Sequence, residues 1–156
     1  RGVSLDSNQA KMTVTAVPDK PGHAARVFTA LAEAAVNVDM IVQNISEEGR
    51  TDMTFSCPTD QVLRAEKAMQ TAKDAGNINY HDLVADEAVA KVSVVGIGMR
   101  SHAGVAAQMF RALHREGINI KVITTSEIKI SVLIERKYME LAVQTLHDAF
   151  ELEKAA

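Results

Sequence analysis

The chain has 156 residues, of which 47% are hydrophobic and 24% are charged, and its net charge is −3. This composition is sufficient for one ordinary domain or two small ones around a real core. The sequence has no basic block and only 4% aromatic residues, which argues against nucleic acid or an anionic membrane as the main partner.

Cys57 is the single cysteine, so the chain has no internal disulfide, and no apolar stretch is long enough to span a membrane. The single cysteine predicts a cytoplasmic protein. Cys57 ends an apolar strand just before Pro58, where we expect a packed small residue rather than a reactive thiol.

Residue patterns predict the elements of the first half of the chain. In chain order, these are a strand over 12–17, a helix after the turn at 18–22, hairpin strands over 38–43 and 53–55, a helix over 62–72 and a closing strand over 79–85. The strands show β-branched residues or period-two alternation, and the helices show apolar residues at helical spacing.

The second half repeats this order. It predicts a strand over 92–97, a helix from Gly104 that stops at Gly117, hairpin strands over 118–122 and 128–132, and a helix over 139–150. The stretch "GHAARVFTALAEAAVNVDMI" at Gly22 resembles "GVAAQMFRALHREGINIKVI" at Gly104, which lies 82 residues later. The chain is therefore an internal duplication.

Each copy reads βαββα and needs one more strand for a βαββαβ sheet. We therefore predict an α+β fold of two ferredoxin-like domains, each an antiparallel sheet with helices on one face. The domains are residues 11–88 and 89–156. "GVSL" at the N-terminus or "FELEK" at the C-terminus can close the second sheet, and we favour completion by the N-terminal strand, residues 1–10. The polar stretch "DSNQ", residues 6–9, predicts a turn that lets the chain cross.

The turn "PDKPG" at the start of the first helix has the chemistry of an amino-acid clamp. Backbone amides at a helix N-terminus suit a carboxylate, and Asp19 offers an acceptor for an ammonium group. Gly22 lets a ligand approach the backbone, and Ala24 leaves space beside it. The alternative is that the turn merely caps the helix and Asp19 offsets its dipole.

The second copy keeps Gly104 but has Ser101 and His102 in place of an acidic residue. Asp39 lies early in a strand, where it is disfavoured; it faces either solvent or a ligand ammonium. Asn37 and Asn119 follow the first helix of each copy, where Asn is frequent for its left-handed geometry alone.

The sequence shows no catalytic or metal-binding constellation. It lacks a phosphate-binding GxxxxGK[ST] loop, a GxGxxG run and a Ser/His/Asp order with supporting context. The five histidines are scattered without metal-ligand spacing. We therefore expect neither catalytic residues nor a metal site in this chain.

Several stretches resemble the paired ACT domains of aspartate kinase. They are "VPDKPGHAARVF", "VNVDMIVQN", "DMTFSCP", "KVSVVGIGMRSHAGVAAQMFRAL" and "INIKVITTSEIKISVLI". The resemblance covers essentially the whole chain. "TTSEIKISVLI" together with "MRSHAGVAA" is specific for this family, whereas "DKPG" marks ACT domains generally. The chain therefore resembles the regulatory subunit or C-terminal regulatory region, without the kinase's catalytic domain.

The resemblance implies two effector sites. The first, of the threonine type, consists of Asp19, Lys20, Pro21, Gly22, His23, Ala24 and Gln43 of the first repeat with Asn119 and Ile120 of the second. The second, whose acidic groups suit lysine, consists of Asp39, Ser46, Ser101, Gly104, Val105, Ser126 and Glu127. Ala103 stands where relatives commonly have proline, which departs from the pattern of the second turn.

By the same resemblance, two chains form a homodimer through their ACT domains and associate with an aspartate kinase catalytic domain or subunit. Threonine, lysine or both then inhibit the first step of aspartate-derived amino-acid synthesis. No cofactor is implied for this chain, and ATP belongs to the kinase domain. The alternatives are an ACT-type dimerisation module without ligand binding, an enzyme in its own right and, more distantly, a nucleic-acid-binding module.

Overall fold

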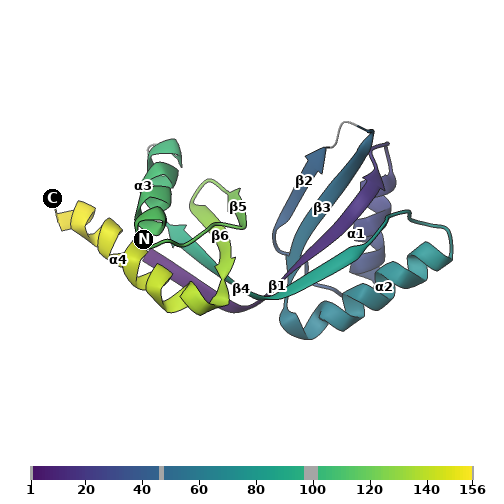
Figure 1. The fold of residues 1–156 in the computed structure, drawn as a ribbon, viewed down its shortest axis with the longest axis horizontal. Helices are drawn as coiled ribbons and strands as arrows, with labels where there is room; N and C mark the ends of the chain where they lie inside the picture. Colours follow the sequence, from purple (N-terminus) through teal and green to yellow (C-terminus); the bar gives the residue numbers. More distant parts are fainter. Residues whose placement is uncertain (1, 46–47, 97–101, 156) are drawn as a thin grey trace. The chain divides into compact units, whose positions relative to one another are not determined.

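The computed structural model describes residues 2–45, 48–96 and 102–155 (Figure 1). In chain order the elements are β1 (Gly2–Pro18), α1 (His23–Glu33), β2 (Ile41–Ile45), β3 (Arg50–Cys57), a 3-10 turn (Thr59–Gln61), α2 (Val62–Asp74), β4 (Leu83–Val95), α3 (His102–Arg115), β5 (Val122–Thr125), β6 (Lys129–Glu135), a second 3-10 turn (Arg136–Tyr138) and α4 (Met139–Ala155). The chain divides into a first unit, residues 8–87, and a second unit, residues 1–7 with 88–156.

The first unit has the strand order β2-β3-β1-β4, with β3 antiparallel to both of its neighbours. Helices α1 and α2 cover one face of this sheet (Figure 1). Its core lies between the sheet and the helices, where the rings of Phe28 and Phe55 meet edge to face with centroids 6.2 Å apart. The predicted α+β architecture is confirmed here.

The second unit has the strand order β1-β4-β6-β5, and α3 and α4 pack together over its core. Strand β1 contributes its first residues to this unit, and Val3 packs against the core. The alternative closing strand "FELEK" is wrong, because these residues continue α4 to Ala155. The apolar spacing that begins at Met139 reaches Phe150, and no glycine or proline follows that would end the helix there.

The turn predicted at residues 6–9 is also wrong, because these residues lie inside β1. Asp, Ser and Asn favour turns when a segment stands alone. Pairing in the sheet supplies partners for the backbone groups and overrides that local preference. As a result, β1 and β4 are long strands, and each runs from one unit into the other.

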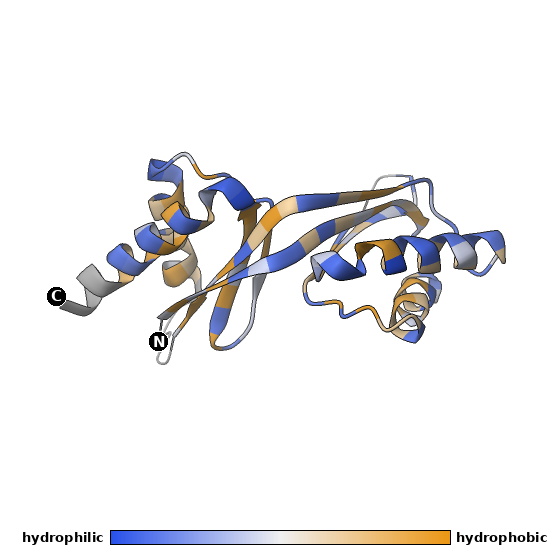
Figure 2. Ribbon diagram, turned by 90° about the horizontal axis from the view of Figure 1, so that it is seen from below, coloured by the Kyte–Doolittle hydropathy of each residue, from blue (hydrophilic) through white to orange (hydrophobic). Residues whose placement is uncertain are grey.

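The helices form because their apolar residues fall on one side. In α1, Val27 and Leu31 are fully buried, four residues apart, while Ala25 and Arg26 are exposed. Hydrophilic and hydrophobic bands alternate along the helices and strands (Figure 2). Burial against a sheet therefore fixes both the position and the rotation of each helix.

Both first helices end in a left-handed residue, Ala35 with φ 58° and Gly117 with φ 69°. The two positions are 82 residues apart, the same offset as the repeat. The predicted stop at Gly117 is confirmed. The expectation that Asn37 and Asn119 supply the left-handed geometry is wrong, since that geometry occurs two residues earlier in each copy.

Candidate functional site

The turn before α1 is held against the β2–β3 hairpin. The Asp19 amide donates a hydrogen bond of 2.8 Å to the Gly49 carbonyl, and the Lys20 amide donates one of 3.0 Å to the Pro18 carbonyl. Gly22 then precedes the helix with φ 93°. A Cβ at Gly22 would meet nothing within 4 Å, so the backbone angle and not the space favours glycine there.

The N-terminus of α1 leaves hydrogen-bond donors open. The first helical bond runs from the Arg26 amide to the Gly22 carbonyl, 3.1 Å long. The amides of Ala24 and Ala25 have no hydrogen-bond partner among the residues that the structure describes. Within the described part of the chain no side chain caps this helix, and its first turn contains no acidic residue. The partial positive charge of the helix end is therefore available to an anion.

Asp19 supplies the opposite charge close by in the chain. Its side chain is exposed, and its carboxylate makes no hydrogen bond or ion pair within the described ranges. Donors for an anion and an acceptor for a cation thus occur within one short turn. This combination is complementary to a zwitterion such as a free amino acid.

Six predicted site residues are consecutive in the chain, four in this turn and two at the start of α1. Asp19, Lys20, Pro21 and Gly22 are exposed. His23 and Ala24 are half-buried, and Ala24 packs against the core of the first unit.

The other three predicted residues of the first site lie on other elements. Gln43 is exposed on β2, in the same hairpin that holds Asp19, and it pairs with Met53. Asn119 is exposed and Ile120 is half-buried, and both belong to the second unit. Ile120 packs against the core of that unit.

The residues predicted for a second site are spread over both units. Asp39 belongs to the first unit, where its amide donates a 2.9 Å hydrogen bond to the Ser56 carbonyl. In the second unit Gly104 is exposed and Val105 is half-buried, both in α3. Ser126 and Glu127 are exposed between β5 and β6. Ser46 and Ser101 lie outside the described residues.

Cys57 is a buried thiol at the end of β3. Burial raises the pKa of this thiol from 9.0 to about 11, and the negative charges of Asp60 and Glu87 add to the rise. A thiol that stays protonated is a poor nucleophile. The prediction of a packed small residue at this position agrees with this environment.

Across residues 2–45, 48–96 and 102–155, no group of three or more His, Cys, Asp or Glu side chains is arranged to hold a metal ion. Within the same ranges, no helix is both long and apolar enough to cross a membrane.

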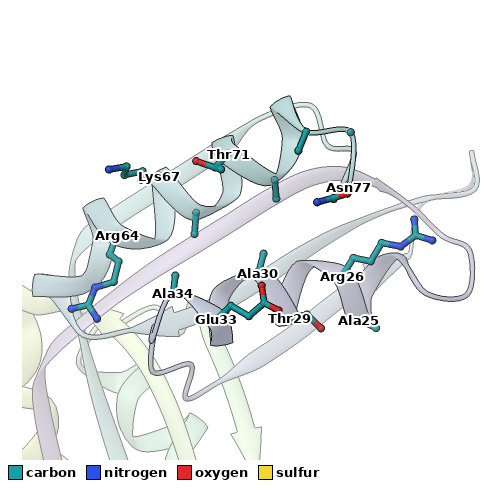
Figure 3. Close-up of a pocket in the computed structure, with 14 residues that line it drawn as sticks. Ala25, Arg26, Thr29, Ala30, Glu33, Ala34, Arg64, Lys67, Thr71 and Asn77 are labelled. Carbon is teal, nitrogen blue, oxygen red and sulfur yellow. The ribbon is translucent and has the colours of Figure 1, made fainter.

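A groove lies between α1 and α2 and was not predicted from the sequence (Figure 3). Its volume is about 930 Å³. Alanines of both helices line it, together with four charged side chains, Arg26, Glu33, Arg64 and Lys67. The Arg64 guanidinium donates a 3.0 Å hydrogen bond to the Ala35 carbonyl. Alanines at helical spacing on both helices were the available sequence signal.

The two units correspond to one domain family. Residues 12–75 match the ACT domain family, and residues 92–150 match it a second time. Both matches fall on a sheet with two helices, and the first contains the turn with Asp19 and the open amides. The fold and the site therefore define a tandem ACT-domain protein.

Comparison with known proteins shows which tandem ACT-domain proteins this chain is similar to. The chain is 50% identical over 156 residues to an aspartate kinase of Pseudomonas fluorescens, covering 99% of this chain and 37% of that protein. It shares 48% identity and a TM-score of 0.87 with the structure of aspartokinase alpha and beta subunits, covering 97% of this chain and 98% of that chain. The structure of the ligand-free regulatory subunit of aspartate kinase from Thermus thermophilus is 39% identical to this chain, with a TM-score of 0.87. The match covers 96% of this chain and 97% of that chain.

The chain belongs to the aspartokinase family, as a regulatory region built of two ACT domains. It spans little more than a third of the length of the Pseudomonas fluorescens relative.

Proposed function

We propose that this chain senses threonine, lysine or both, and so controls an aspartate kinase by feedback inhibition in the cytoplasm. The observation that carries the proposal is the turn before α1, where the open amides of Ala24 and Ala25 accompany the exposed Asp19 carboxylate. Membership of a regulatory family gives this zwitterion-binding chemistry a role.

In the first site, the ligand carboxylate binds the helix-end amides and its ammonium group binds Asp19. Gly22 carries no side chain to block the approach, and the small side chain of Ala24 leaves space beside the amides for the ligand. Gln43 completes the site from β2. Asn119 and Ile120 contribute from the second ACT domain of a partner copy, which makes a homodimer the working unit.

The second proposed site involves Asp39 and Glu127, whose negative charges suit the side chain of lysine. Its other members are Ser46, Ser101, Gly104, Val105 and Ser126. A ligand that contacts two ACT domains favours the arrangement in which both are in reach. The ligand shifts the equilibrium between two arrangements of the kinase by the difference between its binding free energies for them, about 1–3 kcal/mol in typical cases.

The catalytic partner is the aspartate kinase domain or subunit, which transfers a phosphoryl group from ATP to aspartate. This chain needs no cofactor for its own part. Catalysis therefore belongs to the partner, and ligand recognition belongs to the two ACT domains of this chain.

Calorimetry with the 156-residue chain tests the proposal, with threonine, lysine and each of the other common amino acids titrated in turn. We expect heat of binding with threonine or lysine, together with a molecular mass that corresponds to a dimer. Silence toward all amino acids contradicts sensing and indicates a dimerisation module instead. Turnover of aspartate and ATP by the isolated chain contradicts a purely regulatory role.

Asp19→Ala tests the ammonium contact, and Asp60→Ala is its control because it removes an exposed carboxylate elsewhere in the first unit. Asp19→Ala should weaken binding more at low ionic strength than at high, since salt screens exposed charges. Equal losses at both ionic strengths mean that Asp19 makes no electrostatic contact with the ligand.

A further inference from the structure

Strand β1 contains a bulge just before the turn that leads into α1. Val14 pairs with Met53 and Val17 pairs with Thr51, so the two residues between the valines lie opposite Asp52 alone. An extra residue in one strand redirects the chain locally and leaves a break in the ladder of hydrogen bonds.

The bulge shifts the alternation of buried and exposed side chains along β1 by one residue. Val14 and Val17 are both buried in the core although they are three residues apart, whereas a regular strand buries every second residue. A shift by one residue turns every following side chain to the other face. The bulge therefore decides in which direction the chain leaves β1 for the turn at Asp19.

Two side chains of β3 hold the bulge at Ala16, whose φ of 55° lies in the left-handed region that alanine disfavours. The Ala16 amide donates a 3.0 Å hydrogen bond to Oδ1 of Asp52. Nη1 of Arg50 donates a 3.0 Å hydrogen bond to the Ala16 carbonyl. The carboxylate and the guanidinium thus bind the peptide groups on both sides of the strained residue.

The segment before β4 holds the preceding residue, Thr15. Its amide donates a 2.9 Å hydrogen bond to the Asp82 carbonyl, and the His81 amide donates a 2.8 Å bond to the Thr15 carbonyl. Asp19 follows four residues after Thr15, and its own amide is bonded to Gly49, the residue next to Arg50. The bulge and the turn are therefore fixed to the same end of β3.

We propose that Asp52 is a positioning residue of the amino-acid site. It touches no ligand; it binds the Ala16 amide, which keeps the bulge formed and aims the turn over residues 19–24. The inference rests on the proposed function for the identity of the ligand, and on the hydrogen bonds above for the geometry.

The test compares Asp52→Ala with Asp52→Asn, which keeps an oxygen that can accept from the Ala16 amide. Glu66→Ala is the control, because it removes an exposed carboxylate on α2. Backbone amide NMR signals of residues 19–24 are recorded for each variant of the whole chain, first alone and then during titration with threonine and, separately, lysine.

Asp52→Ala should shift the amide signals of residues 19–24 and weaken binding of the responding amino acid about tenfold or more, since small misplacements cost large factors. Asp52→Asn and Glu66→Ala should keep the wild-type signals and affinity. Changes confined to residues 14–17 and 51–53, with full affinity, overturn the proposal. So does an equal loss in Asp52→Asn, because the acceptor would then be irrelevant.

The ligand-free spectra separate this inference from the proposed function. If the wild type responds to neither threonine nor lysine, sensing fails, and the turn signals in Asp52→Ala alone decide the role of Asp52. If Asp52→Ala does not fold, the double variant Ala16→Gly/Asp52→Ala is compared with Ala16→Gly, since glycine takes the left-handed angle without support. Matching signals of residues 19–24 in these two variants then support the proposal, because glycine has replaced the support of Asp52, whereas signals that still shift overturn it.

Discussion

The hydroxyl groups of Ser93 and Ser131 face each other across β4 and β6, with their oxygens 2.7 Å apart in a buried position. The first unit has a counterpart at the same place in its sheet, where the hydroxyls of Thr13 and Thr54 are 3.3 Å apart and partly buried. The duplication has thus kept a cross-strand hydroxyl pair in both units.

A double-mutant cycle on the buried pair should show strong coupling. Ser93→Ala leaves the Ser131 hydroxyl without this partner, and we expect a loss of about 1–3 kcal/mol in the free energy of unfolding. Ser131→Ala should cost a similar amount, and the double variant should cost clearly less than the sum. Urea unfolding measures the cycle. Strictly additive losses would contradict a direct hydrogen bond, and the Thr13/Thr54 cycle should give a smaller coupling.

The two helix ends offer a matched pair of glycine and alanine substitutions. Ala35 is exposed and left-handed, so Ala35→Gly should raise the free energy of unfolding by about 0.5–1 kcal/mol, the relief of strain exceeding the entropy of glycine. Gly117→Ala should lower it by a similar amount, although a Cβ there meets nothing within 4 Å. Thermal or urea unfolding checks both, and a loss of stability in Ala35→Gly would contradict the assigned backbone angle.

Cys57 should make the stability of the chain fall at high pH. Its pKa is raised from 9.0 to about 11 in the folded state, chiefly by burial. Below pH 9 the thiol is protonated in both states and the full contribution to stability is present. As the pH rises from 9 to about 11, the Cys57 thiol ionises in the unfolded chain but stays protonated in the folded one. The free energy of unfolding therefore falls by about 1.4 kcal/mol per pH unit in this window.

Comparison with Cys57→Ala isolates this effect, because the variant lacks the titrating group. The stability advantage of the wild type over the variant should shrink across that pH window, as measured by urea unfolding at several pH values. A difference that stays constant with pH would show that the Cys57 pKa is the same in both states.

Ala24→Thr should weaken threonine binding about tenfold or more, which corresponds to about 1.4 kcal/mol. The added atoms take up the space beside the open helix-end amides, while the buried face of α1 at Val27 and Leu31 is unchanged. Ala32→Thr is the control, since it places the same side chain at an exposed position of the same helix, away from the turn. Calorimetry and a melting curve suffice, and a collapse of the melting temperature would indicate that the turn only caps the helix.

The repeat made much of the fold predictable. Apolar spacing located helices α1 to α4 and the β2–β3 hairpin, and six residues of the first site are contiguous in sequence. The strand predicted over 118–122 overlaps β5 only at Val122. The bulge at Ala16 was not predictable, because Asp52, Arg50 and the segment at His81 act on it from distant parts of the chain. Residues 6–9 look like a turn for the same reason, since their partners in the sheet are not visible in the local pattern.

Strands β1 and β4 each contain residues of both units, which limits where such a protein can be divided. Residues 2–7 of β1 complete the second unit, although residues 8–18 of the same strand belong to the first. A recombination event that transfers residues 88–156 alone would omit residues 2–7 of β1, which form the edge strand of their sheet. The two modules can therefore be exchanged between genes only as one inseparable cassette.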